Sequence, residues 1–181
     1  MAKRLGSLRW PAAVVALLIV AALAYFLLLR SSSVSPRLVS SEPVAMLGSG
    51  SSAVAVAGDG TILTWLPPPE AGSLPELPLT EPPEGPRLRG SALEQARVLG
   101  AAPAALRPYL ARSSYGESGV DVELSSGIEL RFGDATVAAR KWRAAAAVLA
   151  DPEISALDYV DLHAPGHPAI YGSGHALPPV Q

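Results

Sequence analysis

Residues 120–142, "VDVELSSGIELRFGDATVAARKW", decide the fold because the spacing of their apolar residues changes once along the stretch. On both sides of residues 125–127, apolar and charged residues alternate, which is the pattern of two half-buried strands joined by a turn. Asp134 is placed to serve as the N-cap of a helix that follows. The stretch therefore predicts a β-hairpin and a helix that packs on it. The apolar stripe of that helix comprises Ala138, Trp142, Ala145 and Leu149.

Several classes of function find no support in the composition and motifs. Gly133 is not followed by Lys-Ser/Thr, and neither Gly-x-Gly-x-x-Gly nor Gly-x-Ser-x-Gly occurs, so phosphate binding and serine hydrolysis are not indicated. The 181 residues include no cysteine, which excludes disulfides, cysteine-bound zinc and thiol catalysis. The formal net charge of −2 does not favour nucleic-acid binding. Eighteen prolines and sixteen glycines indicate substantial irregular structure.

Residues 11–29 predict a transmembrane helix. They carry no charge and would span roughly 28 Å as a helix, which matches the hydrocarbon core of a bilayer. The basic excess precedes them, so residues 1–10 are expected in the cytoplasm and the rest of the chain outside. A cleaved signal peptide is the alternative, but the run ends in "YFLLLR", which suits an anchor better. Residues 30–41 then form a polar linker.

The remaining elements complete the expected order βββ–αα–ββ–α–ββ. Three short strands are predicted near 43–47, 53–57 and 61–65, with a turn at Asp59-Gly60 before the third. The proline-rich residues 67–86 are expected to cross the face of a sheet. These elements define an α+β class, in which a mainly antiparallel sheet carries packed helices.

Two short helices and two late strands belong to this order. A capping box at Ser91 and Glu94 predicts a helix to Leu99 that is closed by Gly100, and Pro103 suits a second helix. Small residues dominate both helices, so we expect them on the surface. Strands are predicted at 157–162, with Leu157, Tyr159 and Asp161 on one face, and at 169–172. The external domain is thus 42–172, followed by a proline-rich tail at 173–181.

The candidates for chemistry are three histidines near the C-terminus, His163, His167 and His175. A zinc site needs three or four ligands with supporting groups, and only Asp158 and Asp161 could add carboxylates here. No helix would fix two of these ligands on one face. We therefore expect no catalytic residue, cofactor, metal or small-molecule substrate. The alternative is a membrane-anchored envelope enzyme or metal-binding protein that uses these histidines.

The sequence from residue 120, followed by "LDYVDLHAPGHPAIYG", resembles the β-domain of the FtsQ/DivIB family of bacterial cell-division proteins. "SEPVAML", "AGDGTILTW" and "LPEL" resemble earlier segments of the same family. The usual arginine after the Asp-Leu pair is replaced by His163. The family places a POTRA module before its β-domain, whereas only residues 30–41 stand there in this chain. This suggests either a shortened relative or a truncated gene model. The C-terminal family motif is matched by Gly127, Gly133, Lys141, Tyr159, Val160, Asp161 and Leu162.

The resemblance implies a non-enzymatic divisome scaffold in the cell inner membrane at the septum. It would bind FtsB (DivIC)-like and FtsL-like partners by adding a partner strand beside the C-terminal strands. A relative that has lost its partners is a further possibility. The partner-binding residues implied are Tyr159, Leu162, His163, Ala169, Ile170 and Tyr171. Structural roles are implied for Gly127, Gly133, Trp142 and Asp161.

Overall fold

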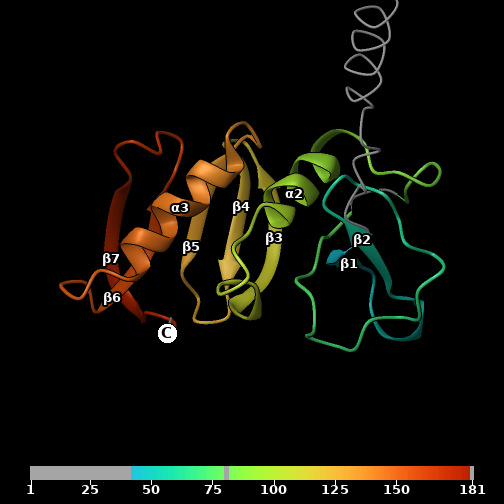
Figure 1. The fold of residues 1–181 in the computed structure, drawn as a ribbon, viewed down its shortest axis with the longest axis horizontal. Coiled ribbons are helices and arrows are strands. Elements are labelled where there is room, and N and C mark those ends of the chain that lie inside the picture. The colour runs from blue at the N-terminus through green and yellow to red at the C-terminus, as the bar shows by residue number, and fades with distance from the viewer. Residues whose placement is uncertain (1–41, 80–81, 180–181) are drawn as a thin grey trace, which may run out of the picture. The chain divides into compact units, whose positions relative to one another are not determined.

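A computed structural model describes residues 42–79 and 82–179, all within one compact unit (Figure 1). The predicted span 11–29 and the linker 30–41 lie outside the described residues. Among the residues that are described, no helix is both long and apolar enough to cross a membrane. The strands are β1 (Pro43–Leu47), β2 (Val54–Ala57), β3 (Leu110–Gly116), β4 (Gly119–Leu124), β5 (Glu129–Gly133), β6 (Ala156–Asp161) and β7 (Ala169–Ala176). The helices are α2 (Gly90–Gly100), α3 (Ala138–Leu149) and the short 3₁₀ turns η1 (Gly50–Ser52) and η2 (Arg107–Tyr109).

Five strands form one sheet in the order β3-β4-β5-β6-β7. All neighbours are antiparallel except β5 and β6, which run parallel because α3 returns the chain to the starting end of the sheet. The α+β class with a mainly antiparallel sheet and packed helices is therefore confirmed. The predicted hairpin of residues 120–132 is β4 and β5, and Leu124 N–H and Gly127 N–H help to close its turn.

The two helices lie across one face of this sheet (Figure 1). The predicted stripe of α3 is buried as expected, and the Trp142 ring lies 4.7 Å from that of Phe132, centroid to centroid. The Trp142 indole N–H also donates to the carbonyl of Val98 at 2.7 Å, which ties α3 to α2. The surface position predicted for α2 is wrong. Its small residues allow close packing, and the helix buries Gln95, Ala96, Val98 and Leu99.

The proline-rich segment joins the β1–β2 hairpin to the five-stranded sheet. Met46 on β1 binds this segment through its backbone, because its N–H donates to the Pro75 carbonyl and its carbonyl accepts from Leu77 N–H. On its other side, Glu76 donates to Ala111 at 3.0 Å and accepts from Ser113 at 2.8 Å. The segment therefore lies between the edges of β1 and β3, and the prediction that it crosses a sheet face is wrong.

The third predicted strand, 61–65, does not form. The turn at Asp59-Gly60 is present, and the Asp59 carboxylate accepts from Thr61 N–H at 3.0 Å. Of residues 61–65, only Thr61 and Ile62 take part in isolated bridges, with Arg87 and Val56 respectively. Ile62 N–H also donates to the carbonyl of Pro86. The chain turns at residues 64–66 and continues into three consecutive prolines at 67–69, which have no backbone N–H to donate to a neighbouring strand.

Strand β3 occupies a stretch for which no strand was predicted. Its sequence, "LARSSYG", lacks an apolar alternation, and it places Ser113 rather than an apolar residue in the core. The second short helix expected from Pro103 is replaced by a turn and by η2, in which Pro108 is accommodated. Pairing with β4 decides this conformation, and such pairing is invisible in a single segment.

Both predicted N-caps are wrong. Helix α2 has Arg89 at its N-cap without a side-chain cap, and Glu94 instead accepts from Ala135 N–H at 2.9 Å, on the turn before α3. Helix α3 starts after Val137, which has a left-handed φ of 49°. Asp134 stabilises the preceding turn by accepting from Thr136 N–H. Gly100 is the last residue of α2 rather than the residue that follows it.

Lys141 is buried, although the sequence places it at the margin of the apolar stripe. Its ammonium donates to the carbonyls of Phe132 at 2.7 Å and Asp134 at 3.1 Å, and to the Asp134 carboxylate at 2.8 Å. The hydrogen bond from Lys141 lowers the pKa of Asp134 to about 2. Lys141 thus fastens α3 to the end of β5.

Replacing Lys141 by methionine is expected to lower the free energy of unfolding by about 1–3 kcal/mol, because two carbonyls lose their donor. Urea unfolding of the full chain at neutral pH measures this change. Arg140→Met is the matched control, since Arg140 is an exposed cation on the same helix and should change stability by less than about 0.5 kcal/mol. Equal effects of the two variants would contradict this account of Lys141.

Candidate partner-binding edge

Strand β7 forms one edge of the five-stranded sheet, and all eight of its residues are exposed. At the other edge, β3 already exchanges backbone bonds with Glu76. Within residues 42–79 and 82–179, no segment pairs with the outer side of β7. An edge of this kind presents unpaired N–H and C=O groups to another chain. The sheet therefore has one edge occupied by its own chain and one that is open.

The ladder between β6 and β7 contains an irregularity near its middle. Tyr171 pairs with Tyr159 and His175 pairs with Leu157, so β7 has extra residues between these pairs. Gly172 adopts a positive φ of 83°, and the Asp158 carboxylate accepts from Gly174 N–H at 2.8 Å. Because of this bulge, β7 offers a straight edge only on either side of residues 172–174.

The prediction that Leu157, Tyr159 and Asp161 share one face of β6 is wrong. Leu157 is buried together with Val160 and Leu162, whereas Tyr159 and Asp161 lie on the opposite, polar face of the sheet. A strict alternation from Leu157 would have placed it with Tyr159 and Asp161. The bulge changes the alternation between Leu157 and Tyr159, and a sequence pattern cannot reveal such a change.

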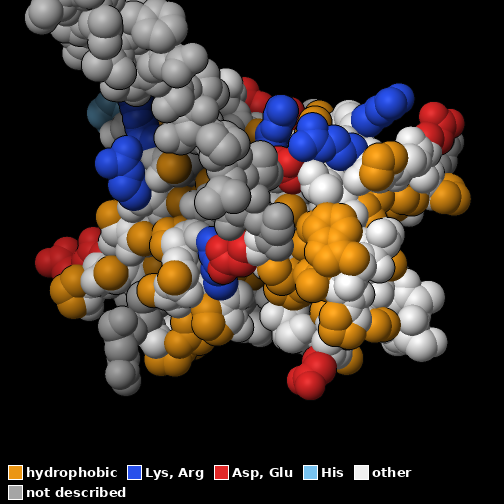
Figure 2. Space-filling view, turned by 45° about the vertical axis from the view of Figure 1, so that its right-hand side comes forward, with side chains coloured by type: hydrophobic (Ala, Val, Ile, Leu, Met, Phe, Trp, Pro, Cys, Tyr) orange, Lys and Arg blue, Asp and Glu red, His pale blue; other side chains and the backbone are white. Residues whose placement is uncertain are grey.

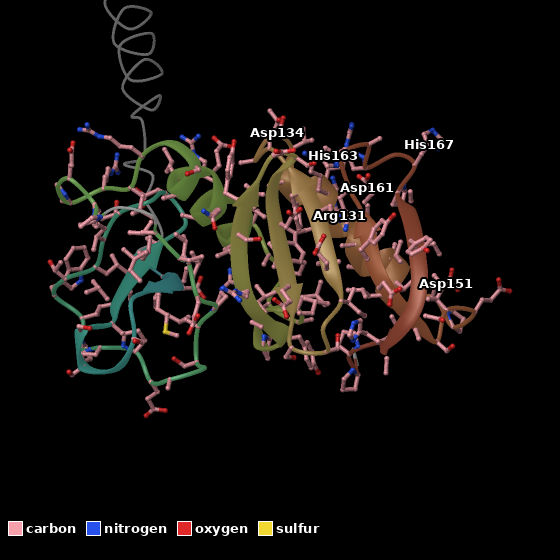
Figure 3. The ribbon with its side chains drawn as sticks, turned by 180° about the vertical axis from the view of Figure 1, so that it is seen from behind. Arg131, Asp134, Asp151, Asp161, His163 and His167 are labelled. Atoms are coloured by element: carbon pink, nitrogen blue, oxygen red, sulfur yellow. The ribbon has the colours of Figure 1, made fainter. Side chains whose placement is uncertain are left out.

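Three side chains stack across the polar face toward the open edge. The guanidinium of Arg131 lies 3.7 Å from the centroid of the Tyr159 ring, and that ring stacks on Tyr171 at 5.3 Å. Arg131 is also paired with Glu129 at 2.5 Å, and this hydrogen bond raises the pKa of Arg131. The stack gives the open edge a rigid aromatic surface. Figure 3 shows Arg131 on the central strands of the sheet.

The residues implied as partner-binding fall into three places. Tyr159, Ala169, Ile170 and Tyr171 lie together on the β6–β7 ladder, with Ile170 and Tyr171 47% and 63% exposed. Leu162 is completely buried, so its side chain contributes to the core rather than to the surface. His163 lies at the end of the sheet near Asp134 (Figure 3), where its ring contacts Asp161, the last residue of β6 in the ladder.

Sequence reasoning missed Arg131, Glu129 and Asp158 as parts of this surface. The alternation in "IELRF" does place Glu129 and Arg131 on the polar face, which was the available signal. Their convergence with Tyr159 depends on the parallel pairing of β5 and β6. The contact of Asp158 with Gly174 depends on the bulge, for which the sequence carries no direct signal.

Asp121 belongs to the charged positions of the alternating hairpin pattern, for which exposure to solvent is the usual expectation, but it is half-buried. One of its carboxylate oxygens is inaccessible and accepts no hydrogen bond from the described residues. Burial raises the pKa of Asp121, and the nearby Glu129 carboxylate raises it further. The polar face is therefore less uniformly solvated than its sequence pattern indicates.

The three histidines do not converge on a metal site. A Cβ built on Gly133 would lie 2.6 Å from the His163 ring, and one built on Gly127 would lie 2.6 Å from the His175 ring. Gly127 and Gly133 flank the two ends of β5, so these two rings lie at opposite ends of a strand. No group of three or more His, Asp or Glu residues suited to a metal occurs in the described part of the chain. The geometry thus gives the metal-binding alternative no support.

A groove beside the β1–β2 hairpin does not favour catalysis either. It encloses about 600 Å³ and is lined by aliphatic, proline, glycine and hydroxyl residues, with no acid, base or histidine. Figure 2 shows hydrophobic side chains spread over this side of the molecule. Trp65, 64% exposed, and Leu66 are among the exposed large hydrophobic residues of the chain.

The fold and this edge together define a small α+β domain in which, among the described residues, β7 has no strand beside its outer edge. Residues 45–163 match the family model described as "Cell division protein FtsQ/DivIB, C-terminal". The chain belongs to the FtsQ/DivIB family and is a cell-division protein. The match ends at His163, so β7 lies beyond the matched residues. No curated protein matches the chain.

Proposed function

We propose that this protein is a non-enzymatic scaffold of the division machinery, and that it binds FtsB/DivIC-like and FtsL-like proteins by strand addition at β7. The open, fully exposed edge of β7 is the observation that carries the proposal. In such addition, main-chain hydrogen bonds supply affinity and alternate side chains supply specificity. Membership in a family of division proteins supports the choice of partners.

The surface for the added strand consists of Ala169, Ile170 and Tyr171, backed by Tyr159. These three residues form the straight part of β7 before the bulge at Gly172. Ile170 pairs with the buried Val160 and therefore points toward the helix side, while Tyr171 continues the stack on the polar face. An added strand would thus meet one apolar and one aromatic side chain on opposite faces.

The location belongs to the same proposal. We place the protein at the division septum, anchored in the cell membrane by residues 11–29 with its N-terminus in the cytoplasm. The uncharged run and the basic residues before it support this topology. The β-domain would then meet the external segments of its partners.

Replacing Ile170 by aspartate is expected to weaken partner binding about 5- to 150-fold, because the added strand would bury a carboxylate without a partner, at a cost of about 1–3 kcal/mol. The measurement is calorimetric titration of the full chain with synthetic external segments of the host's FtsB-like and FtsL-like proteins. Tyr115→Asp is the matched control, since Tyr115 is 51% exposed on β3, at the other edge.

Each outcome of this titration has a distinct meaning. Weakening by Ile170→Asp and not by Tyr115→Asp supports both the scaffold and its site. If the Ile170→Asp variant binds the segments as tightly as the wild type, β7 is not the binding site. A wild-type chain that binds neither segment rejects the scaffold proposal and favours a relative that has lost its partners.

A further inference from the structure

His163 holds together three parts of the chain at one end of the sheet. Its Nδ1 lies 2.7 Å from Oδ1 of Asp161, at the end of β6, and its Nε2 lies 3.1 Å from the carbonyl oxygen of Ser118, in the β3–β4 turn. The ring rests directly on Gly133, where a Cβ would come within 2.6 Å of it. The ring therefore has a fixed place between two hydrogen-bonding partners.

Both partners of the ring are acceptors. A peptide carbonyl has no hydrogen to donate, and an ionised carboxylate has none either. Burial acts to raise the pKa of Asp161, but hydrogen bonds from the backbone and ring of His163 outweigh it and lower that pKa below its usual value. Asp161 is thus ionised at neutral pH. Both contacts form together only when each ring nitrogen carries a hydrogen, which is the imidazolium form.

We propose that His163 is a proton-operated clasp that ties the β3–β4 turn to the end of β6 when the ring is doubly protonated. Loss of one proton leaves a single N–H for two acceptors. The nitrogen without a hydrogen then faces an oxygen lone pair, and that contact opens. Because the Asp161 carboxylate is the stronger acceptor, the remaining hydrogen stays on Nδ1, and the Ser118 contact is the one that is lost.

The direction of the pH dependence follows from the groups around the ring. The hydrogen bond to Asp161 and the contact with the Ser118 carbonyl raise the pKa of His163 above 6.5, against smaller opposing effects of burial and of Lys141 on α3. Asp121 on β4 and Arg131 on β5 also face this cluster. A raised folded-state pKa means that the clasp is closed below about pH 6.5 and opens as pH rises through the folded-state value.

The clasp concerns a part of the chain outside the proposed partner surface, and it does not depend on the proposed function. Residues 163–168 lead from the clasp to β7, so His163 also fixes where that connection begins. Opening of the clasp frees the β3–β4 turn first. The turn is therefore where the effect should be measured.

Hydrogen exchange of the full chain at pH 5.5 and pH 8, corrected for the intrinsic exchange rate, tests the clasp. Amides of residues 114–120 should be protected roughly five-fold less at pH 8, as expected for loss of one hydrogen bond. His163→Arg keeps a charged donor at both pH values and should abolish this difference. Side-chain NMR of the same protein should show His163 titrating above pH 6.5.

Two control variants show which group operates the clasp. His167→Gln changes an exposed histidine of the following loop and should keep the wild-type pH dependence, as should Asp121→Asn. Asp161→Asn should lower the midpoint for His163 and gives a second test if the arginine variant does not fold. Equal protection of the turn at both pH values in the wild type overturns the proposal. So does a pH dependence that disappears in Asp121→Asn, or a His163 midpoint at or below 6.5.

Discussion

Replacement of Trp142 by alanine is expected to lower the free energy of unfolding by about 3–5 kcal/mol, the range found when large aromatic residues are removed from a core. Trp142 is completely buried, and it is the largest of the fully buried side chains among the described residues. Its ring packs on Phe132 at 4.7 Å and its N–H bonds the carbonyl of Val98. The substitution therefore leaves a cavity between the sheet and both helices, and it removes the stronger of two donors to the Val98 carbonyl, which keeps only the 3.2 Å bond from Ala101 N–H.

Chemical unfolding of the full chain, followed by circular dichroism, measures this loss. Trp65→Ala is the matched control, because Trp65 is 64% exposed and its removal should change stability by less than about 0.5 kcal/mol. Comparable losses in the two variants would show that Trp142 does not anchor the core as described.

A second large effect is expected from Gly119→Ala, with a loss of about 2–6 kcal/mol. Gly119 opens β4 with φ +102°, and a Cβ there would lie 2.1 Å from the carbonyl oxygen of Gly133. That oxygen belongs to the backbone of β5, so it cannot be displaced by a side-chain rotation. The β4–β5 ladder must shift, and with it the support under the His163 ring.

Gly85→Ala separates the collision from the backbone strain. Gly85 has a similar φ of +109°, and nothing lies within 4 Å of the Cβ that alanine would add. The Gly85→Ala variant should lose only the free energy of unfolding that is due to placing alanine at a positive φ, about 1–3 kcal/mol. Thermal unfolding of the two variants side by side makes the comparison. A loss for Gly119→Ala no larger than that for Gly85→Ala would exclude the collision.

The elements that the sequence predicts well are those whose apolar period is local and complete. β4, β5 and α3 combine alternation, a glycine turn and a helical stripe within residues 119–149, and the structure follows each of these signals. β3 carries no such period, and its conformation comes from pairing with β4 on one side and Glu76 on the other. Long-range pairing of this kind is the information that a single segment lacks.

The capping residues were mispredicted for a related reason. Ser91 and Glu94 have the spacing of a capping box, yet Glu94 accepts from the amide of Ala135. Asp134 has the identity of an N-cap, yet it binds Thr136 and the ammonium of Lys141. For Glu94 the partner is distant in sequence, and this tertiary contact forms instead of the capping box. For Asp134 the partners are two and seven residues ahead, so a local turn and the ammonium of Lys141 take the carboxylate instead of the first amides of α3.

The candidate site was predictable in position but not in detail. The family resemblance implied one surface containing Tyr159, Ile170 and Tyr171, and the structure brings these residues together on the β6–β7 ladder. The extent of β7, its bulge and the contact with Asp158 follow from register, which the sequence pattern does not specify. The stack of Arg131 on Tyr159 also depends on the parallel pairing of β5 with β6, which the sequence pattern does not reveal either.

Closure of one sheet edge by Glu76 has a consequence for the valency of this domain. A sheet with two open edges can accept a strand on each side and so grow into a chain of subunits. Here the Glu76 segment takes the position on β3 that a second strand would need, within the described residues. Under the strand addition proposed at β7, a second strand could not be added beside β3. The proposed assembly would then end at this sheet with one partner strand on β7, and it would not extend into a filament through β3.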